Sequence, residues 1–108
     1  MAIDKLHSKY NRLLEVSNPN KVIENANKYL GKGKYEIFIS DNKDKKYMIL
    51  TPENKRVHFG NINYLDYTKH NDDMRRKAYL ARASKIRGNW KENKYSPNNL
   101  SLKLLWNA

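Results

Sequence analysis

The amino-acid sequence predicts an α+β protein. Apolar residues recur at helical spacing in the first thirty residues and again toward the C-terminus. Between these regions, apolar and polar residues alternate along three short segments that turn-forming residues separate. We therefore expect two N-terminal helices, a three-stranded antiparallel meander, a basic helix and a short C-terminal helix.

The two N-terminal helices are predicted from apolar spacing and from end signals. The first is expected over residues 3–16. The second begins at Pro19, a residue that suits the first helical position, with Asn18 as its cap. Gly31 and Gly33 end it, as glycines that adopt a left-handed conformation commonly do.

Three strands follow, each marked by alternation. They are expected at residues 35–40, 46–51 and 57–59. The stretches 41–44 and 52–55 are rich in Asp, Asn, Pro and Lys, which is typical of turns. Such short connections join neighbouring antiparallel strands, so the sheet is predicted to be a meander.

After the strands, residues 61–70 have no clear period, and we expect an ordered loop held by its tyrosines. A helix then follows, with Asp72 and Asp73 in its first turn, where carboxylates suit the positive end of the helix dipole. It is predicted to reach about Ile86, and Gly88 ends it.

A last short helix is expected from Ser96 and Pro97 onward. Five of the seven residues from Leu100 to Trp106 are large and apolar, which is more than one face of a short helix buries. We therefore expect an exposed attachment surface here. Its anchors would be Trp90, Leu105 and Trp106.

Length and composition limit the possible classes. The 108 residues suffice for one domain, and we expect an N-terminal helical extension (1–33) on a small α+β domain (34–108). Without cysteine, disulfides, thiolate metal sites and cysteine nucleophiles are excluded. No apolar run approaches the length of a membrane span, and nothing indicates a secretory signal.

The net charge of +11 is uneven, because twelve basic and four acidic residues follow residue 53. It is densest in residues 75–91, called here the basic segment, which has seven cations and no acid. Such a surface favours a polyanionic or acidic partner. The predicted contact residues are Arg75, Arg76, Lys77, Arg82, Lys85, Arg87 and Lys91.

Arg75, Tyr79 and Arg82 are spaced to share one stripe of the helix. They could form a phosphate-contacting edge with a stacking aromatic. Alternatively, Tyr79 packs inward while Arg75 or Arg82 pairs with Asp66 and locks the loop to the helix. Both interpretations remain open on the sequence.

The loop itself is predicted to be a structural clasp, because an ordered loop must satisfy its backbone groups. Its members are Tyr64, Asp66, Tyr67, Thr68, His70 and Asp72. A metal site formed by His58, Asp66, His70 and Asp72 is a weaker alternative, since no recognised ligand or nuclease spacing is present. We expect no metal and no cofactor.

One pattern resembles a known family. Its residues are Val57-x-Phe59-Gly60, Tyr64-x-Asp66-Tyr67-Thr68-x-His70-x-Asp72, Arg75-Arg76-x-x-Tyr79-x-x-Arg82, Trp90 and Leu105-Trp106. It resembles a small uncharacterised family of large double-stranded DNA viruses of eukaryotes and some tailed phages, over roughly residues 46–108. The resemblance implies a viral setting and no particular activity.

Together these observations predict a non-enzymatic viral structural or accessory protein. It would dock its basic helix on an acidic partner, either capsid protein or packaged genome, and copies could self-associate. The alternative is a nucleic-acid-binding protein with backbone contacts and little sequence specificity. The expected location is the virion, with the host cytoplasm or viral factory during assembly.

Overall fold

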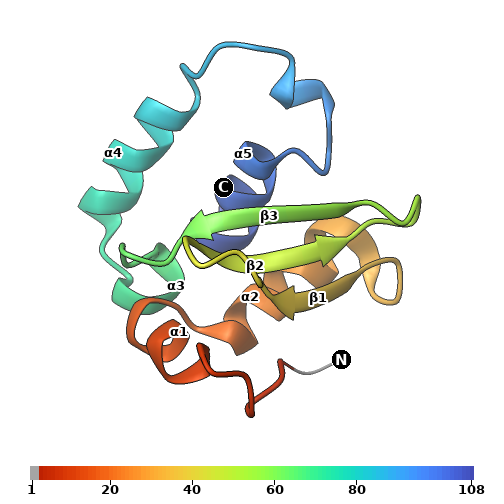
Figure 1. Cartoon of the computed structure of the whole chain (residues 1–108). Coiled ribbons are helices and arrows are strands. Elements are labelled where there is room, and N and C mark those ends of the chain that lie inside the picture. The colour runs from red at the N-terminus through yellow and green to blue at the C-terminus, as the bar shows by residue number, and fades with distance from the viewer. Residues whose placement is uncertain (1–2) are drawn as a thin grey trace.

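The computed structural model describes residues 3–108 (Figure 1). Its first helix, α1 (Tyr10–Val16), is shorter than the predicted helix over residues 3–16. Before it, the Asp4 carboxylate accepts the Leu6 backbone N–H at 2.9 Å, and His7 Nδ1 accepts the Lys9 N–H at 3.0 Å. These local bonds compete with helical ones, so the chain turns until Tyr10.

Helix α2 (Pro19–Ala26) confirms the predicted second helix. The Asn18 side chain accepts the Lys21 N–H at 3.3 Å, as a helix cap does. A π-helical turn, η1 (Asn27–Gly31), extends it, and Gly31 leaves the helix with a φ of 95°.

The predicted meander is also confirmed. Strands β1 (Glu36–Ile39), β2 (Lys45–Leu50) and β3 (Arg56–Asn61) pair antiparallel in the order β1-β2-β3. The inward side chains of β1 and β2 include Ile37 and Ile49, which are register partners and both buried.

The connection after β3 contains an unpredicted short helix, α3 (Tyr67–His70). Helix α4 (Asp73–Ala83) follows, with Asp72 as its cap, and stops before the predicted end at Ile86. The carbonyl of Ala83 accepts from the Asn98 side chain at 3.2 Å, and that of Ile86 accepts from Trp90 Nε1 at 2.7 Å. The Asn98 side chain thus occupies the carbonyl at the end of α4 that a further helical turn would use, while the Trp90 bond lies beyond the helix.

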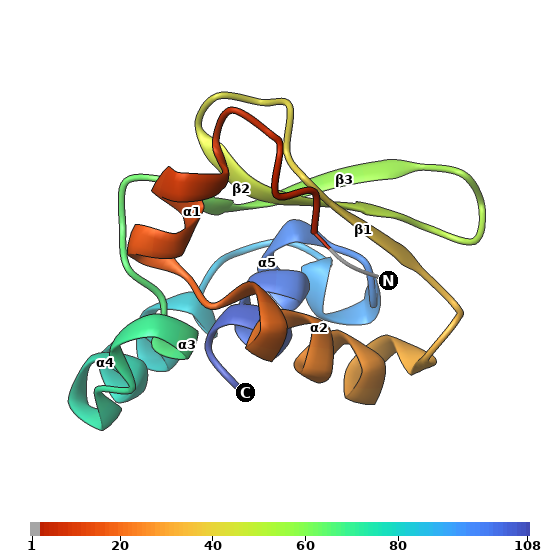
Figure 2. The ribbon, with the colours of Figure 1, turned by 90° about the horizontal axis from the view of Figure 1, so that it is seen from below.

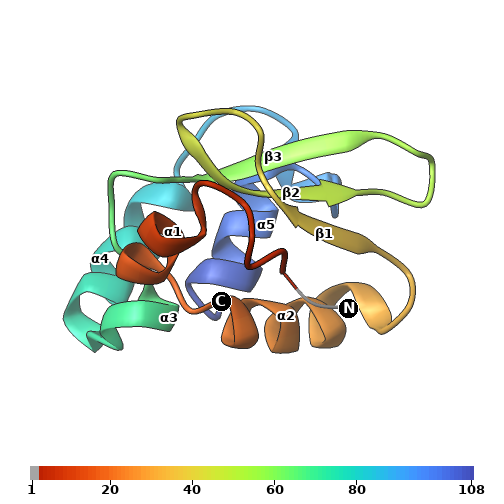
Figure 3. The same ribbon diagram turned by 60° about the horizontal axis from the view of Figure 1, so that its bottom comes forward.

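The chain returns through a 3₁₀ turn, η2 (Trp90–Glu92), to helix α5 (Pro97–Leu100) and a π-helical turn, η3 (Ser101–Leu105). Figures 2 and 3 show α5 between the sheet and α2. Every apolar residue of this segment, from Leu100 to Trp106, is buried. The prediction of an exposed attachment surface was therefore wrong, because the sheet, α2 and α4 cover different sides of the segment.

One hydrophobic core includes residues from both sides of the predicted boundary at residue 33. Leu13 and Val22 belong to the same buried cluster as Ile49 and Leu104. Helices α1 and α2 therefore help to enclose the core that the C-terminal segment fills. Among residues 3–108, every helix is too short or too polar to span a lipid bilayer.

Candidate functional site

The basic segment forms an arm at the side of the molecule. In Figure 1, α4 and the chain that follows it lie beyond the edge of the sheet before returning to α5. Six of its seven cations are exposed: Arg75, Lys77, Arg82, Lys85, Arg87 and Lys91. Residues two apart point to different sides of a helix, so Lys77 does not share the stripe of Arg75. The exposed cations therefore do not form one flat face.

Arg76 is the exception, and its prediction as a partner contact was wrong. Its Nε donates to the carbonyl of Trp106 at 2.8 Å, and its NH2 donates to that of Asn107 at 2.7 Å. The guanidinium also lies over the Tyr67 ring, 5.5 Å from its centre. The Arg76 side chain thus links Trp106 and Asn107 to α4, and its guanidinium is occupied by these contacts within the fold.

The centre of the predicted clasp is a buried polar network. The Asp66 carboxylate accepts from Lys46 Nζ at 3.0 Å and from the Thr68 hydroxyl. Because the Thr68 hydroxyl donates to Asp66, it accepts from Ser17 Oγ at 3.3 Å, and Ser17 in turn accepts from the Tyr47 hydroxyl at 2.8 Å. The network connects β2, the chain before α3 and the junction of α1 and α2. Burial raises the pKa of Tyr47, which keeps its hydroxyl a donor.

The other clasp residues are nearer the surface. The Tyr67 hydroxyl donates to Asp73 at 2.7 Å, and the Asp72 carboxylate accepts the N–H groups of Met74 and Arg75. Tyr64 differs, because its side chain is exposed and forms no hydrogen bond within residues 3–108. The structure therefore places Tyr64 outside the clasp.

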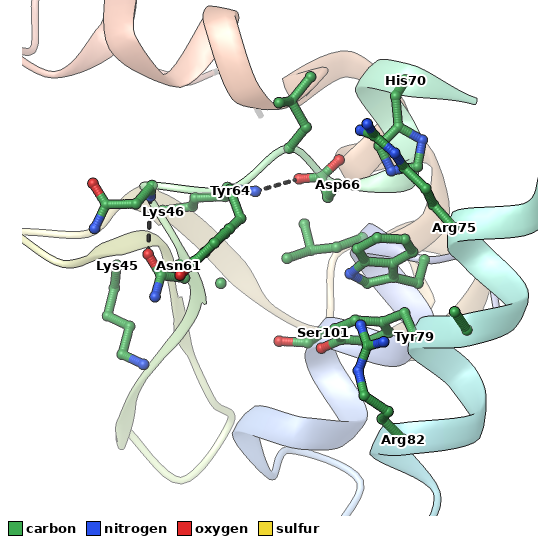
Figure 4. Close-up of a pocket in the computed structure, with 16 residues that line it drawn as sticks. Lys45, Lys46, Asn61, Tyr64, Asp66, His70, Arg75, Tyr79, Arg82 and Ser101 are labelled. Atoms are coloured by element: carbon green, nitrogen blue, oxygen red, sulfur yellow. Dashed lines mark hydrogen bonds and ion pairs between the residues drawn. The ribbon is translucent and has the colours of Figure 1, made fainter. Parts of the chain in front are cut away.

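A cavity of about 670 Å³ lies between the clasp and α4 (Figure 4). Arg75, Tyr79 and Arg82 line it from α4, while Lys45, Asn61 and Tyr64 line it from the sheet end and the following loop. Ser101, Leu105 and Trp106 contribute from the C-terminal segment. Most of the polar groups on this lining are hydrogen-bond donors or cations.

The structure bears out one part of the second interpretation of the arginines and contradicts the other. Asp66 pairs with Lys46 and not with Arg75 or Arg82. Arg75 has only an exposed contact with Asp72 at 3.7 Å, and Arg82 forms no ion pair among residues 3–108. Tyr79 packs inward as the alternative predicted, but neither arginine locks the loop to the helix through Asp66, and both are exposed.

The aromatic wall of the cavity consists of rings that contact one another. The ring of Tyr79 stacks on Trp106 with a centroid distance of 4.1 Å and an angle of 6°, and His70 contacts Trp106 at 5.3 Å. Burial raises the pKa of Tyr79, while a hydrogen bond with Ser101 opposes this shift. Trp106 is thus a core residue that supports the cavity, and its prediction as an interface anchor was wrong, as was that of Leu105.

His70 contains an unusual polar atom. Its Nδ1 accepts the Asp72 N–H at 2.9 Å, so the proton of the neutral ring lies on Nε2. Nε2 is buried and has no hydrogen-bond partner among the described residues. Burial and the neighbouring Arg75 lower the pKa of His70, which favours the neutral ring.

Trp90 is half-buried and bonds to residues that precede and follow it in the chain. Besides its indole bond to Ile86, its carbonyl accepts from Ser96 Oγ at 3.0 Å and from Asn99 Nδ2 at 2.8 Å. These bonds give it a structural role within the arm.

Within residues 3–108, no group of three or more His, Asp or Glu side chains is placed to hold a metal ion. His58 lies apart from the proposed ligands and bonds to Ser40 Oγ through Nδ1 at 2.7 Å.

The sequence did not predict that Lys46 pairs with Asp66, or that Lys45, Asn61 and Ser101 line the cavity. By alternation Lys46 would face outward with Met48, so its burial at 2% exposure has no signal in the sequence. Its pairing with Asp66 depends on how the loop crosses the strand end, which no local pattern encodes. Lys45, Asn61 and Ser101 have no signal either.

Residues 35–83 match the model of a family of unknown function, DUF5754. The match includes the sheet, α3 and α4, and hence the clasp and both cavity arginines, but not the C-terminal segment that completes the cavity. No curated protein and no solved structure matches the chain.

Proposed function

We propose that this chain is a non-enzymatic viral accessory protein that docks its basic segment on the phosphate backbone of nucleic acid, as a component of the virion. The observation that carries the proposal is the set of exposed cations on the arm, with no acidic residue between Arg75 and Lys91. Close like charges repel one another unless a polyanion neutralises them. Backbone phosphates supply such charges at regular spacing without any need for base recognition.

The arm is well placed for this role. It lies at the side of the molecule, so a duplex or a single strand could approach without displacing the sheet (Figure 1). Cations such as Arg75 and Lys77, which point to different sides of a helix, can contact phosphates on more than one side of it. Two of the arm's cations, Arg75 and Arg82, also line the neighbouring cavity beside the exposed Tyr64, and tyrosine is a common stacking residue in nucleic-acid sites.

The test is a salt titration of binding to a duplex of arbitrary sequence. If four to six cations contact phosphates, the logarithm of the affinity should fall with the logarithm of salt at a slope of about −4 to −5. Replacing Lys77, Lys85, Arg87 and Lys91 with Gln should make the slope shallower by about 3 to 4. A second duplex of different sequence should bind equally.

The matched control removes four exposed cations elsewhere, Lys5, Lys32, Lys34 and Lys43. Equal loss in both variants would mean that net charge alone drives binding, and that the arm is not the interface. A flat salt response, or no binding at low salt, would exclude the genome as the partner. An acidic capsid protein would then be the partner to seek in purified particles, by comparing the shell with the genome fraction.

A further inference from the structure

The cavity beside α4 has a lining that suits an anion. Its only carboxylate, Asp66, is already bonded to Lys46 and Thr68. Lys45 and Arg82 form no ion pair within residues 3–108, so the lining keeps an excess of positive charge. Planar guanidinium groups fit phosphate oxygens well.

His70 supplies an independent indication of the same chemistry. Its Nε2–H is a buried donor without an acceptor, and the residue lines the cavity next to Arg75 (Figure 4). A buried donor without a partner is costly, and an anionic oxygen in the cavity would satisfy it once the ring turned to expose Nε2. A cation or a purely apolar ligand would leave the donor unpaired.

The opposite side of the cavity suits a flat ring. Tyr64 is 67% exposed at the cavity margin, and no hydrogen bond or ring contact of its side chain explains that position. A base can stack on such a tyrosine whatever its identity. The volume of about 670 Å³ lies within the range of roughly 300–1,000 Å³ that is usual for small-molecule sites.

We propose that this cavity binds one nucleoside phosphate, with the phosphate between Arg75 and Arg82 and the base against Tyr64. The nucleotide can be part of a single strand or free in solution, because both present the same groups. The proposal deepens the proposed function and rests on it for the strand-bound case. The cavity would bind a single nucleotide, whereas the outward cations of the arm would contact only the phosphate backbone of nucleic acid.

Thymidine monophosphate, thymidine and inorganic phosphate are the probes, titrated into the whole chain and followed by amide NMR shifts. The monophosphate should bind saturably and shift residues 61–66 and 75–82, and the two fragments should each bind more weakly. Tyr64→Ala should weaken the monophosphate about tenfold or more but leave inorganic phosphate unchanged. Arg75→Gln with Arg82→Gln should weaken both.

The controls match these changes outside the cavity. Phe38→Ala removes an aromatic that is 43% exposed on the sheet, and Arg12→Gln with Arg56→Gln removes two exposed arginines. Neither should alter binding. Three results would overturn the proposal. They are the absence of saturable binding of the monophosphate, binding of the monophosphate that is no tighter than that of inorganic phosphate, and an affinity for the monophosphate that is the same in either cavity variant as in the unchanged chain.

Two further measurements distinguish a strand-bound nucleotide from a free one, and binding at the cavity from binding at the arm. Displacement of the monophosphate by an oligothymidylate of about ten nucleotides, a length within the usual site sizes, would identify a strand as the source. Absence of displacement would identify the free nucleotide. The Lys77, Lys85, Arg87 and Lys91 variant should lose duplex binding while it retains the monophosphate, so failure of the arm and failure of the cavity are distinguishable.

Discussion

Lys46 Nζ lies 3.0 Å from the carboxylate of Asp66, and the two side chains are only 2% and 1% exposed. A buried ion pair persists only when its remaining hydrogen-bonding groups are also satisfied. Here Thr68 donates to the carboxylate, and the carbonyl of Val16 lies 3.5 Å from the ammonium. Burial lowers the pKa of Lys46, and the charge of Asp66 opposes that shift.

Asp66→Asn should strongly destabilise the protein. It leaves the Lys46 ammonium buried without a counter-charge, and breaking a buried pair in this way typically costs about 3–5 kcal/mol. Chemical denaturation monitored by circular dichroism measures the change in the free energy of unfolding.

The control is Glu53→Gln, which removes one partner of the exposed Lys55–Glu53 pair at 3.8 Å and should change stability by less than about 0.5 kcal/mol. Lys46→Met combined with Asp66→Leu should be more stable than Asp66→Asn alone, since no buried charge then remains. A small loss in Asp66→Asn would contradict the view that this pair holds the loop.

Arg76→Gln and Lys77→Gln are neighbouring changes with opposite expected results. The first removes two hydrogen bonds from a charged group to C-terminal carbonyls and should cost about 2–3 kcal/mol. The second removes an exposed charge and should leave stability nearly unchanged but make the salt slope of DNA binding shallower by about 1. Thermal denaturation and the salt titration are the measurements, and similar behaviour of the two variants would show that Arg76 is not structural.

Gly60→Ala should be more damaging than Gly33→Ala. Both glycines have positive φ, 80° and 81°, so both substitutions carry comparable backbone strain. At Gly60 a Cβ would also lie 2.9 Å from Leu105 Cδ1 and 3.2 Å from Lys46 Cβ, whereas at Gly33 it would meet nothing within 4 Å. Overpacking of this kind costs about 1–3 kcal/mol, which the difference in unfolding free energy should reveal. Equal losses would mean that the C-terminal segment can move away from β3.

The pH dependence of stability should contain a contribution from His70. Burial, followed by Arg75, lowers its pKa in the folded state, with Asp72 and Asp66 opposing and Lys46 adding to the shift. As the pH falls below about 6.5, the unfolded chain takes up a proton that the folded ring resists, so stability should decrease. His70→Asn should flatten this part of the profile of unfolding free energy against pH. A profile that is unchanged in the variant would exclude His70 as the cause.

The elements that could be predicted are those specified locally. Asn18 and Pro19 define the start of α2 by their own side chains, and alternation between residues 35 and 59 defines the strands. The end of α4 could not be predicted, because the carbonyl of its last residue, Ala83, is bonded by the Asn98 side chain from a later part of the chain.

The site was predictable only in part for the same reason. The charge of the basic segment is visible in the sequence, but whether a given cation is free depends on contacts across the fold. Arg76 and Lys77 are adjacent, yet only one of them meets the C-terminal carbonyls. The lining of the cavity comes from β2, from the end of β3 with the loop and α3 after it, from α4 and from the C-terminal segment, so it emerges only once the chain has folded.

Substitution of Trp106 tests whether the C-terminal segment belongs to the core or contacts a partner. Its ring is buried between Tyr79 and His70, and its carbonyl accepts from Arg76. Trp106→Ala should therefore destabilise the whole domain by about 3–5 kcal/mol, as truncation of a large core aromatic does. Chemical denaturation followed by circular dichroism measures the loss.

Trp90→Ala is the matched control, because that indole is only half-buried and lies outside the core cluster. It should cost less and loosen only the arm, which proteolysis between residues 84 and 96 would detect. Sedimentation at a temperature where both variants remain folded should show the same mass as the unchanged chain. If Trp106→Ala instead keeps its stability but loses self-association or incorporation into particles, the ring contacts a partner and the core role assigned to it is wrong.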